Sequence, residues 1–470
     1  MAKANFRSLQ NLIDEKPDLV KYLSNETLAP MRARTALLAG FVPLEFTNWR
    51  DEQRAWRETA VLWDQTHHMP ELYVKGPDAA RLLGRVSIQN LGNFSPDRAK
   101  QFIACTPRGH VVGDCIAFCL APDSYVLVSG MQIFNWVRYN AETGGYNVTL
   151  ELDNASVFNA KGRRTNFRFQ LEGPNAGKIF NEIVDGGAPE IAFFRCVSLK
   201  IGGHDVRVLR HGMAGHMGVE MFGPFDEMEA VRSLIVAAGK RHRLLQGGTK
   251  AYFTTLFESG WLPYPFPGIY TGEELRPYRE WLAADSFESN VQLAGSFQSS
   301  DVEDYYVTPW DLGFGHLLKF DHDFIGREAL ERMSKQPKRK KMTLVWNRDD
   351  LVKVFTSQFG NGPRFKAMEF PSIYFGWPQL DAVRDSSGSL AGVSFHCGYT
   401  SNEGEVLSLA AINESQAIPG KELILTWGEP NGGSAKPQVE RHEQTTIRVV
   451  VAPCPYPKSV QQMQKVSISR

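Results

Sequence analysis

The sequence predicts an α+β protein of several domains that ends in a small β-barrel. The first reason is length, because 470 residues are too many for one ordinary core and indicate two to four domains. The second is the order of strand and helix patterns between residues 167 and 241, which is typical of a mixed sheet with helices on one face. The third is a series of short strand patterns after residue 341, separated by Gly, Asn and Pro turns, which predicts an all-β C-terminal domain.

The first 130 residues combine helix patterns with a strand and a hairpin. Residues up to about 45 favour a helical lead-in that ends at Pro43. The polar pattern of residues 48–57 predicts a helix, and apolar density returns in AVLW at 60–63. We then expect a strand at 72–74, a helix start at 77–83, a hairpin at 102–120 around the turn 107–110, and a third strand at 125–129.

The rest of the chain divides at two unusual segments. The proline- and aromatic-rich stretch 252–277 is too rigid for a disordered linker and predicts an ordered lining. The basic run KQPKRKK at 335–341 favours a solvated linker between domains, with a nucleic-acid role as the alternative. Around these segments we expect strands at 167–171, 197–201, 206–209, 342–346, 392–397, 407–412, 423–427 and 446–451, and helices at 176–183, 227–241 and from 324–327.

Composition excludes several classes of function. Lys+Arg and Asp+Glu are equal at 52 each, so the chain has no electrostatic footprint for nucleic acid or an anionic membrane. The six cysteines are scattered without a CxxC pair, which favours buried or incidental thiols in a reducing compartment, and we expect the cytoplasm. No signal peptide, membrane-length apolar run, Walker loop or metal-ligand spacing is present, and tandem His67 and His68 cannot chelate one metal from a strand. We expect no metal.

The stretch LRHGMAGHMGVEMFG, residues 209–223, is the most informative part of the chain. Its four glycines allow sharp bends or close approach of a ligand, and they deliver Glu220 at the start of a strand. A carboxylate beside apolar residues needs donors, and a ligand with two parallel N–H groups would supply them. The alternative is a hairpin whose Glu220 faces water.

Five blocks spread over the chain resemble the folate-dependent aminomethyltransferase superfamily, whose type member is the T-protein of glycine cleavage. They are VLWDQTHHMPELYVKGPDAARLL, FQLEGPNA, RHGMAGHMGVEMF, TTLFESGWLP and VTPWDLGFGHLLKFDHDFIGREAL. Within it, the tandem histidines, the YFTTLFESGWLPYPFPGIYTGEELRPYREWL segment and EDYYVTP resemble the tetrahydrofolate-dependent aryl O-demethylases. These enzymes demethylate the lignin-derived substrates syringate, vanillate and 3-O-methylgallate.

The resemblance implies a fold of three domains around a central channel that holds folate. It divides the chain into an N-terminal α/β part at 1–150 with segment 245–335 packed back on it, a ferredoxin-like α+β domain at 151–245, and a β-barrel at 336–470. It also implies that Glu220 grips the pterin through N3–H and the exocyclic amine. Gln170 would offer amide groups to the same ring, and Trp261 would stack against the pterin or benzoyl portion, although ordinary strand packing also explains both residues.

The sequence departs from the T-protein pattern at two places. Tyr252 and Phe253 replace an arginine-containing block, and Asp114 alone remains of an acidic pair, preceded by Gly113. This argues against an aminomethyl substrate carried by a lipoyl protein. Asp114 is equally well explained by hairpin stabilisation and by catalysis.

The resemblance gives a mechanistic hypothesis for methyl transfer to N5 of tetrahydrofolate. Tyr252 would donate to the departing phenolate oxygen, because a phenol is protonated at neutral pH. His68 would hold the adjacent phenolic hydroxyl of the substrate, and Trp63 would form one wall of the aryl pocket. Packing in the core is the alternative explanation for Tyr252 and His68.

Two other functions stay open at this point. A folate-binding assembly protein of the same fold would not turn over, but the Lys-Gly-Cys-aromatic-x-Gly-Gln-Glu motif of those relatives is missing here. A demethylase of a small sulfonium or amine donor would need only a compact pocket. The partners that we expect are therefore tetrahydrofolate and a small aromatic molecule, without nucleic acid or membrane, and the sequence does not indicate the oligomeric state.

Overall fold

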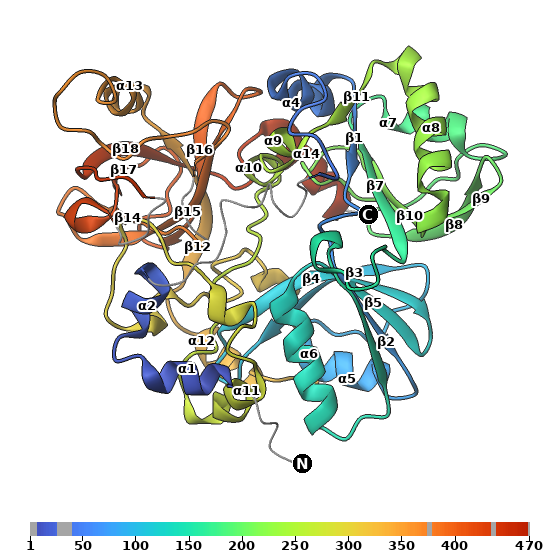
Figure 1. The fold of residues 1–470 in the computed structure, drawn as a ribbon, viewed down its shortest axis with the longest axis horizontal. Helices are drawn as coiled ribbons and strands as arrows, with labels where there is room; N and C mark the ends of the chain where they lie inside the picture. The colour runs from blue at the N-terminus through green and yellow to red at the C-terminus, as the bar shows by residue number, and fades with distance from the viewer. Residues whose placement is uncertain (1–6, 26–39, 374–377, 434–438, 469–470) are drawn as a thin grey trace.

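The computed structural model describes residues 7–25, 40–373, 378–433 and 439–468. Its strands form three sheets of six, seven and five strands. Figure 1 shows the six-stranded sheet at the upper right, the five-stranded sheet below it, and the seven-stranded sheet on the left. The described part of the predicted lead-in forms helices α1 (Leu9–Glu15) and α2 (Leu19–Asn25), and the rest of that prediction, 26–39, lies outside the described residues.

The six-stranded sheet has two faces of different character. Helices α7 (Ala176–Ile183) and α8 (Met228–Gly239) pack on one face, where Phe167, Phe169 and Leu171 are fully buried. The opposite face turns toward the five-stranded sheet and carries polar side chains. In spatial order the strands are β11 (Leu244–Gly247), β1 (Ala60–Asp64), β7 (Asn166–Glu172), β10 (Gly218–Pro224), β9 (His204–Leu209) and β8 (Cys196–Ile201).

The five-stranded sheet shares one large core with the segment after residue 248. Phe102, Leu127 and Val137 of the sheet and its helices are buried in the same cluster as Phe266 and Leu330. The strands are β3 (Ala99–Cys105), β4 (Val111–Ala121), β5 (Ser124–Val128), β2 (Glu71–Lys75) and β6 (Thr149–Asp153), with helices α5 (Ala79–Val86) and α6 (Met131–Thr143). The later segment contains α9 (Thr249–Tyr252), α10 (Thr255–Ser259), α11 (Arg276–Trp281) and α12 (Arg327–Met333).

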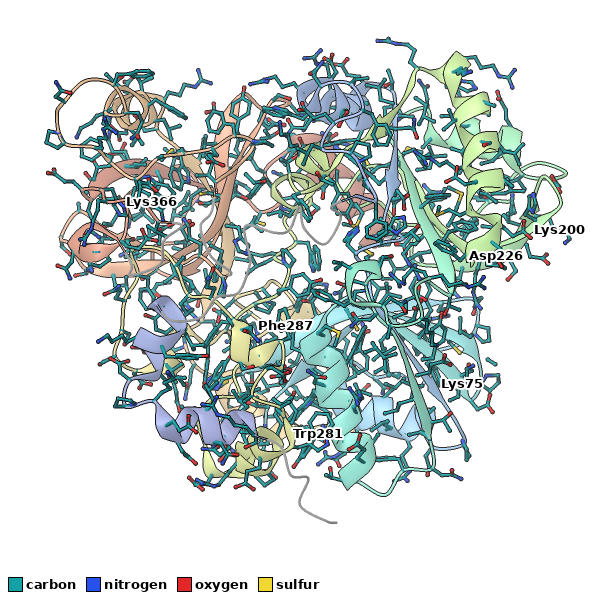
Figure 2. All side chains as sticks on the ribbon, in the orientation of Figure 1. Lys75, Lys200, Asp226, Trp281, Phe287 and Lys366 are labelled. Carbon is teal, nitrogen blue, oxygen red and sulfur yellow. The ribbon has the colours of Figure 1, made fainter. Side chains whose placement is uncertain are left out.

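Aromatic contacts tie this later segment to its neighbours. The ring of Trp281, at the end of α11, lies 5.8 Å from that of Tyr139 on α6 in an edge-to-face arrangement. The ring of Phe287 lies 5.9 Å from that of Tyr264, and Figure 2 shows Phe287 and Trp281 along the middle of the molecule. The predicted order of segment 252–277 is confirmed, because Phe266, Ile269 and Tyr270 are buried, and its role as a lining stays a prediction.

The C-terminal sheet closes on itself and confirms the predicted barrel. The last strand in the spatial order, β16, pairs back with β15 and closes the sheet, while the two-residue strand β13 adds to β15 from outside this ring. Ile447, Val449 and Val451 point inward along β18, with exposed Arg448 and Val450 between them. The strands are β13 (Ser372–Ile373), β15 (Leu390–Thr400), β14 (Asp381–Arg384), β17 (Glu422–Trp427), β18 (Thr445–Ala452), β12 (Arg339–Trp346) and β16 (Glu405–Asn413). Helices α13 (Arg348–Thr356) and α14 (Lys458–Ile468) accompany them.

The predicted domain boundaries differ from the sheets at three points. Strand β1 falls within 1–150 but joins the six-stranded sheet, because it pairs in parallel with β11 and antiparallel with β7. Strand β6 crosses residue 150 and pairs with β2 of the five-stranded sheet. The basic run is not a solvated linker throughout, because Arg339 and Lys341 already belong to β12. Long-range strand pairing decides these boundaries, and local composition does not indicate it.

Several compositional predictions can be compared with the described residues. All six cysteines are free, and all but Cys454 are buried, as predicted for incidental thiols. No helix among the described residues is long and apolar enough to cross a bilayer. Helix α4 (Trp49–Glu58) begins where its sequence predicts, since the Asn48 side chain accepts a hydrogen bond from the Asp51 amide.

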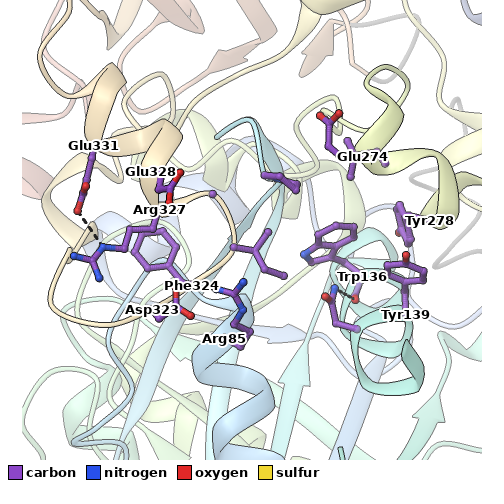
Figure 3. A pocket seen from close by; sticks show the side chains of 15 residues that line it. Arg85, Trp136, Tyr139, Glu274, Tyr278, Asp323, Phe324, Arg327, Glu328 and Glu331 are labelled. Atoms are coloured by element: carbon purple, nitrogen blue, oxygen red, sulfur yellow. Dashed lines mark hydrogen bonds and ion pairs between the residues drawn. The ribbon is translucent and has the colours of Figure 1, made fainter. Parts of the chain in front are cut away.

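A surface cavity of about 640 Å³ lies among α5, α6, α11 and the segment that leads into α12 (Figure 3). Trp136, Tyr139 and Tyr278 form its aromatic side. Its two arginines are paired, Arg85 with Asp323 and Arg327 with Glu331, at 3.0 Å each. None of the predicted site residues lines this cavity.

Candidate active site

Three of the predicted site residues form a single row across the six-stranded sheet. Trp63 on β1 is the antiparallel partner of Gln170 on β7, and Gln170 is the partner of Glu220 on β10. Directly opposed residues of antiparallel strands point to the same face and have Cβ atoms roughly 5 Å apart. Residues from three distant parts of the chain are therefore side by side.

Alternation along β7 explains why this row is polar. Phe167, Phe169 and Leu171 point into the core beneath α7 and α8. Because strand side chains alternate, Arg168 and Gln170 point to the opposite face. Both are buried, so β7 contributes covered polar side chains to this face.

Two glycines of the predicted turn pack directly against neighbouring backbone atoms. A Cβ on Gly218 would lie 2.6 Å from the Leu171 carbonyl oxygen, and one on Gly212 would lie 2.0 Å from the His216 carbonyl oxygen. The Glu172 carboxylate secures the turn, because the amides of Ala214 and His216 donate to its Oε1 at 2.9 and 3.1 Å. Burial raises the pKa of Glu172 to about 7. The tight backbone packing that these glycines allow is confirmed, and the close approach of a ligand stays a prediction.

Glu220 is buried, and one of its oxygens is already bonded. Arg168 donates from Nη1 to Glu220 Oε1 and from Nη2 to Glu71 Oε1, the latter at 2.6 Å. No group of the described residues donates to Oε2 of Glu220. Burial works to lower the pKa of Arg168, but the charges of Glu220 and Glu71 outweigh it and raise that pKa. The alternative of a Glu220 that faces water is wrong.

Gln170 presents an acceptor to the site. Its Nε2 donates to the carbonyl oxygen of His211 at 2.7 Å, which fixes the orientation of the amide because a carbonyl can only accept. Its Oε1 is buried without a hydrogen-bond partner. The free acceptors of Gln170 and Glu220 therefore lie next to each other, on paired residues.

A second group of residues adjoins this row at Trp63. The ring of Tyr252, at the end of α9, lies 5.5 Å from the Trp63 ring in an edge-to-face arrangement. Its hydroxyl accepts a hydrogen bond from Gln65 Nε2 at 3.3 Å and lies 3.1 Å from His68 Nε2. The hydrogen-bond partners of the Tyr252 hydroxyl are therefore side chains. The core-packing explanation would have required a backbone partner instead.

The ionisation states of this group follow from burial. Burial raises the pKa of Tyr252 above its ordinary value, so the phenol stays protonated at neutral pH. Burial, helped by the charge of Arg164, lowers the pKa of His68 to about 3, and the imidazole is neutral. His68 Nδ1 is buried without a partner and is free to bind a ligand.

The tandem histidines differ in their surroundings, but both are buried. His67 stacks on Phe41 with ring centroids 4.5 Å apart, and its Nδ1 lies 2.9 Å from Ser156 Oγ. His68 faces Tyr252. His67 is therefore the packed member of the pair and His68 the one that reaches the site.

Trp261 contacts the five-stranded sheet, whereas the row of Glu220, Gln170 and Trp63 lies on the six-stranded sheet. Its Nε1 donates to Oδ2 of Asp114 on β4 at 2.9 Å, and Gln101 donates to the same oxygen at 2.6 Å. Burial raises the pKa of Asp114 to about 6, against the opposing hydrogen bond from Trp261. The structure places Trp261 through Asp114 and the five-stranded sheet, and Asp114 Oδ1 stays buried without a partner.

Sequence reasoning missed Arg168, Glu71 and Gln65. Arg168 has a local signal, because it is two residues before Gln170 in an alternating strand. Glu71 and Gln65 have none, because their contacts with Arg168 and Tyr252 span 97 and 187 residues.

Comparison with known proteins identifies the family. Residues 28–265 match the GCVT N-terminal domain. The chain spans most of a solved structure, glycine cleavage system aminomethyltransferase T from Bartonella henselae, with a TM-score of 0.60 at 16% identity over 89% of this chain and 92% of that one. That likeness shows the fold alone. The chain belongs to the GCVT aminomethyltransferase family.

Two curated relatives are more specific. The chain is 44% identical to the syringate O-demethylase of Sphingobium sp. (strain SYK-6) over 450 residues, 96% of each chain. It is 29% identical to the sesamin methylene transferase of Sinomonas sp. (strain No.22) over 440 residues, 89% of this chain and 90% of the relative. The predictions of an enzyme and of tetrahydrofolate as its cofactor are confirmed by these similarities.

Proposed function

We propose that the protein is an aryl O-demethylase that transfers the methyl group of a methoxy-substituted hydroxybenzoate, of the syringate and vanillate type, to N5 of tetrahydrofolate. The products are 5-methyltetrahydrofolate and a catechol. The observation that carries this proposal is the continuous row from Glu220 through Gln170 to Trp63 and on to Tyr252. Similarity to a syringate O-demethylase over nearly the whole chain supports the choice of substrate class.

The residues of the row fit a reduced pterin. Its edge carries N3–H and an exocyclic amine, and the unbonded Oε2 of Glu220 and Oε1 of Gln170 offer adjacent acceptors. A buried acceptor without a partner, such as Gln170 Oε1, is costly without a ligand, so a donor of the pterin edge would relieve that cost. Each hydrogen bond to the charged carboxylate contributes about 1.5–3 kcal/mol. Trp261, held by Asp114, would cover the pterin or its benzoyl portion.

Bound tetrahydrofolate supplies N5 as the nucleophile that accepts the methyl group. The protein has to stabilise the electron pair that remains on the phenolic oxygen when its bond to the methyl carbon breaks. Tyr252 is suited to this task, because burial keeps its phenol protonated. In the tautomer with the proton on Nε2, His68 donates to the Tyr252 oxygen together with Gln65, which leaves the phenol proton for the departing oxygen and Nδ1 of His68 as an acceptor.

The same geometry suggests how the aryl ring is held. His68 is neutral, and its unpartnered Nδ1 can bond the phenolic hydroxyl next to the scissile ether. Trp63 is fully buried and would pack against the aryl ring of the substrate, on the side nearest Gln170 and Glu220. We also propose a cytoplasmic enzyme, in keeping with its six free cysteines.

A substrate panel tests the proposal. Purified protein with tetrahydrofolate should consume syringate or vanillate and should leave dimethylsulfonium and N-methylamine donors untouched. Consumption of a sulfonium or amine donor alone would replace this proposal by the small-donor demethylase. Tight folate binding without turnover of any methyl donor would favour the non-catalytic assembly protein.

A further inference from the structure

We propose that Arg168 is a positioning residue that holds the Glu220 carboxylate charged and oriented toward the pterin. This inference rests on the proposed function, because it concerns how the pterin acid is kept ready. It adds a role for a residue that touches neither substrate nor cofactor in the account above.

Arg168 stands between two carboxylates that belong to different sheets. Glu220 lies on β10 of the six-stranded sheet, whereas Glu71 lies on β2 of the five-stranded sheet. The two terminal nitrogens of one guanidinium are divided between them. All three side chains are at most 3% exposed. The arginine therefore fixes the position of Glu220 against the second sheet.

The guanidinium itself has little freedom. Its carbon lies 4.6 Å from the ring centroid of Phe222, the antiparallel partner of Arg168, and 5.4 Å from that of Phe118. Glu71 is held in turn, because Tyr73 donates to its Oε2 at 2.6 Å and Asn166 donates to the same oxygen at 3.2 Å. This packing holds the guanidinium of Arg168 in one orientation, the one in which it donates to Glu220.

The charge of Arg168 matters for what Glu220 can bind. A buried carboxylate without a cation takes up a proton, and a protonated carboxyl presents an O–H donor. The pterin edge also presents donors, so that a protonated Glu220 would lose one of its two acceptor positions. Arg168 removes this competition.

The other titratable groups around Glu220 cannot replace this cation. Burial lowers the pKa of His211, so that its imidazole is neutral, and burial raises the pKa of Cys196 and Tyr252, so that both stay protonated. Glu71 and Glu172 are acids. The groups that face Glu220 or its row are Arg168 and Glu172 on β7, Glu71 and Tyr73 on β2, Cys196 on β8, His211 before β10, and Tyr252 on α9.

The pH dependence of tetrahydrofolate affinity separates positioning from mere structure. The double variant Arg168→Met/Glu71→Gln removes the cation and the second acid together, so that Glu220 is the charge left behind. Relative to the wild type, we expect calorimetry to give an affinity at least about tenfold weaker at about pH 6 than at about pH 8.5, because a buried carboxylate that has lost its cation favours the protonated form. Glu172 titrates in the same range, because burial raises its pKa to about 7, so the result is the affinity of the double variant divided by that of the wild type at each pH.

Three further variants complete the test. Arg168→Lys keeps the charge but cannot bridge both acids, so we expect weaker binding with the pH profile of the wild type. Arg339→Met is the matched control, because it removes a cation from another buried acid, Asp311, at 2.8 Å, and its profile should follow the wild type. If the double variant does not fold, Arg168→Gln/Glu71→Gln gives the same comparison with amide groups in place.

The outcomes separate this inference from the proposed function. Glu220→Gln with wild-type affinity would remove Glu220 from the pterin site and would overturn the positioning role, while the substrate panel decides the proposed function independently. A weakened Glu220→Gln beside an Arg168 double variant whose affinity falls equally at every pH would overturn the positioning role alone. A pH-dependent loss in the double variant, absent from Arg339→Met, supports it.

Discussion

The hydroxyl oxygen of Tyr252 lies 3.1 Å from Nε2 of His68, although the two residues are 184 positions apart in the chain. Burial keeps the phenol protonated and the imidazole neutral. This pair therefore offers one proton donor and one neutral partner beside the Trp63 ring. Neither group needs to change its charge before the substrate arrives.

Tyr252→Phe tests whether the phenol acts only as the ether bond breaks. The variant keeps the ring and removes the donor, so kcat should fall by roughly 10²–10⁴-fold while KM changes little. The loss should be smaller for substrates with a more acidic leaving phenol, since these need less help. Single-turnover kinetics measures the chemical step directly. A kcat within about threefold of the wild type would mean that Tyr252 packs against the substrate and does not donate to the departing oxygen.

Gly247→Ala tests the placement of Trp63. Gly247 on β11 is the parallel partner of Trp63, and a Cβ there would lie 1.9 Å from the indole Cζ3. The ring must move, so we expect KM for the aryl substrate to rise by roughly tenfold, the cost of a disturbed pocket contact. The matched control is Gly177→Ala on α7, where the added methyl meets nothing within 4 Å. Equal KM values for the two variants would contradict a wall role for Trp63.

Asp114→Asn should change stability in a pH-dependent way. The pKa of Asp114 is raised to about 6 from an ordinary value of 3.8, so its contribution to stability is complete below about pH 3.8 and is lost as pH rises through about 6. Asparagine avoids this loss of up to about 3 kcal/mol. The variant should therefore gain more Tm over the wild type at about pH 8 than at about pH 4.5.

Differential scanning calorimetry at the two pH values checks this prediction. Asp123→Asn, at an exposed position in the turn between β4 and β5, is the control and should shift Tm equally at both. A larger gain for Asp114→Asn at the acidic pH would mean that the buried carboxyl is ionised in the folded protein throughout this range.

Local patterns predicted most elements of the fold. The alternation of FRFQLE, the helix start at Asn48 and the short C-terminal strands each reflect burial on one face or a satisfied helix end, which neighbouring residues determine. Sheet membership could not be predicted in this way. Strand β1 belongs with β11 and β7, and that pairing depends on residues more than a hundred positions away.

In the candidate site, too, some residues could be predicted from the sequence and others could not. The resemblance to the family placed Glu220, Gln170 and Tyr252 in one site, and the structure brings their side chains to one region of the molecule. The partners that define their chemistry were not predictable, because Arg168 reaches Glu71 in another sheet and Trp261 is held by Asp114. Such hydrogen bonds leave no local pattern in the sequence.

The fate of the methyl carbon tests the central claim most directly. Syringate or vanillate with a ¹³C-labelled methoxy group is incubated with the protein and tetrahydrofolate, and the products are followed by NMR. The account predicts that the label appears in 5-methyltetrahydrofolate, in equal amounts with the catechol and without formaldehyde. Label released as formaldehyde or methanol, or a catechol that forms without tetrahydrofolate, would contradict it.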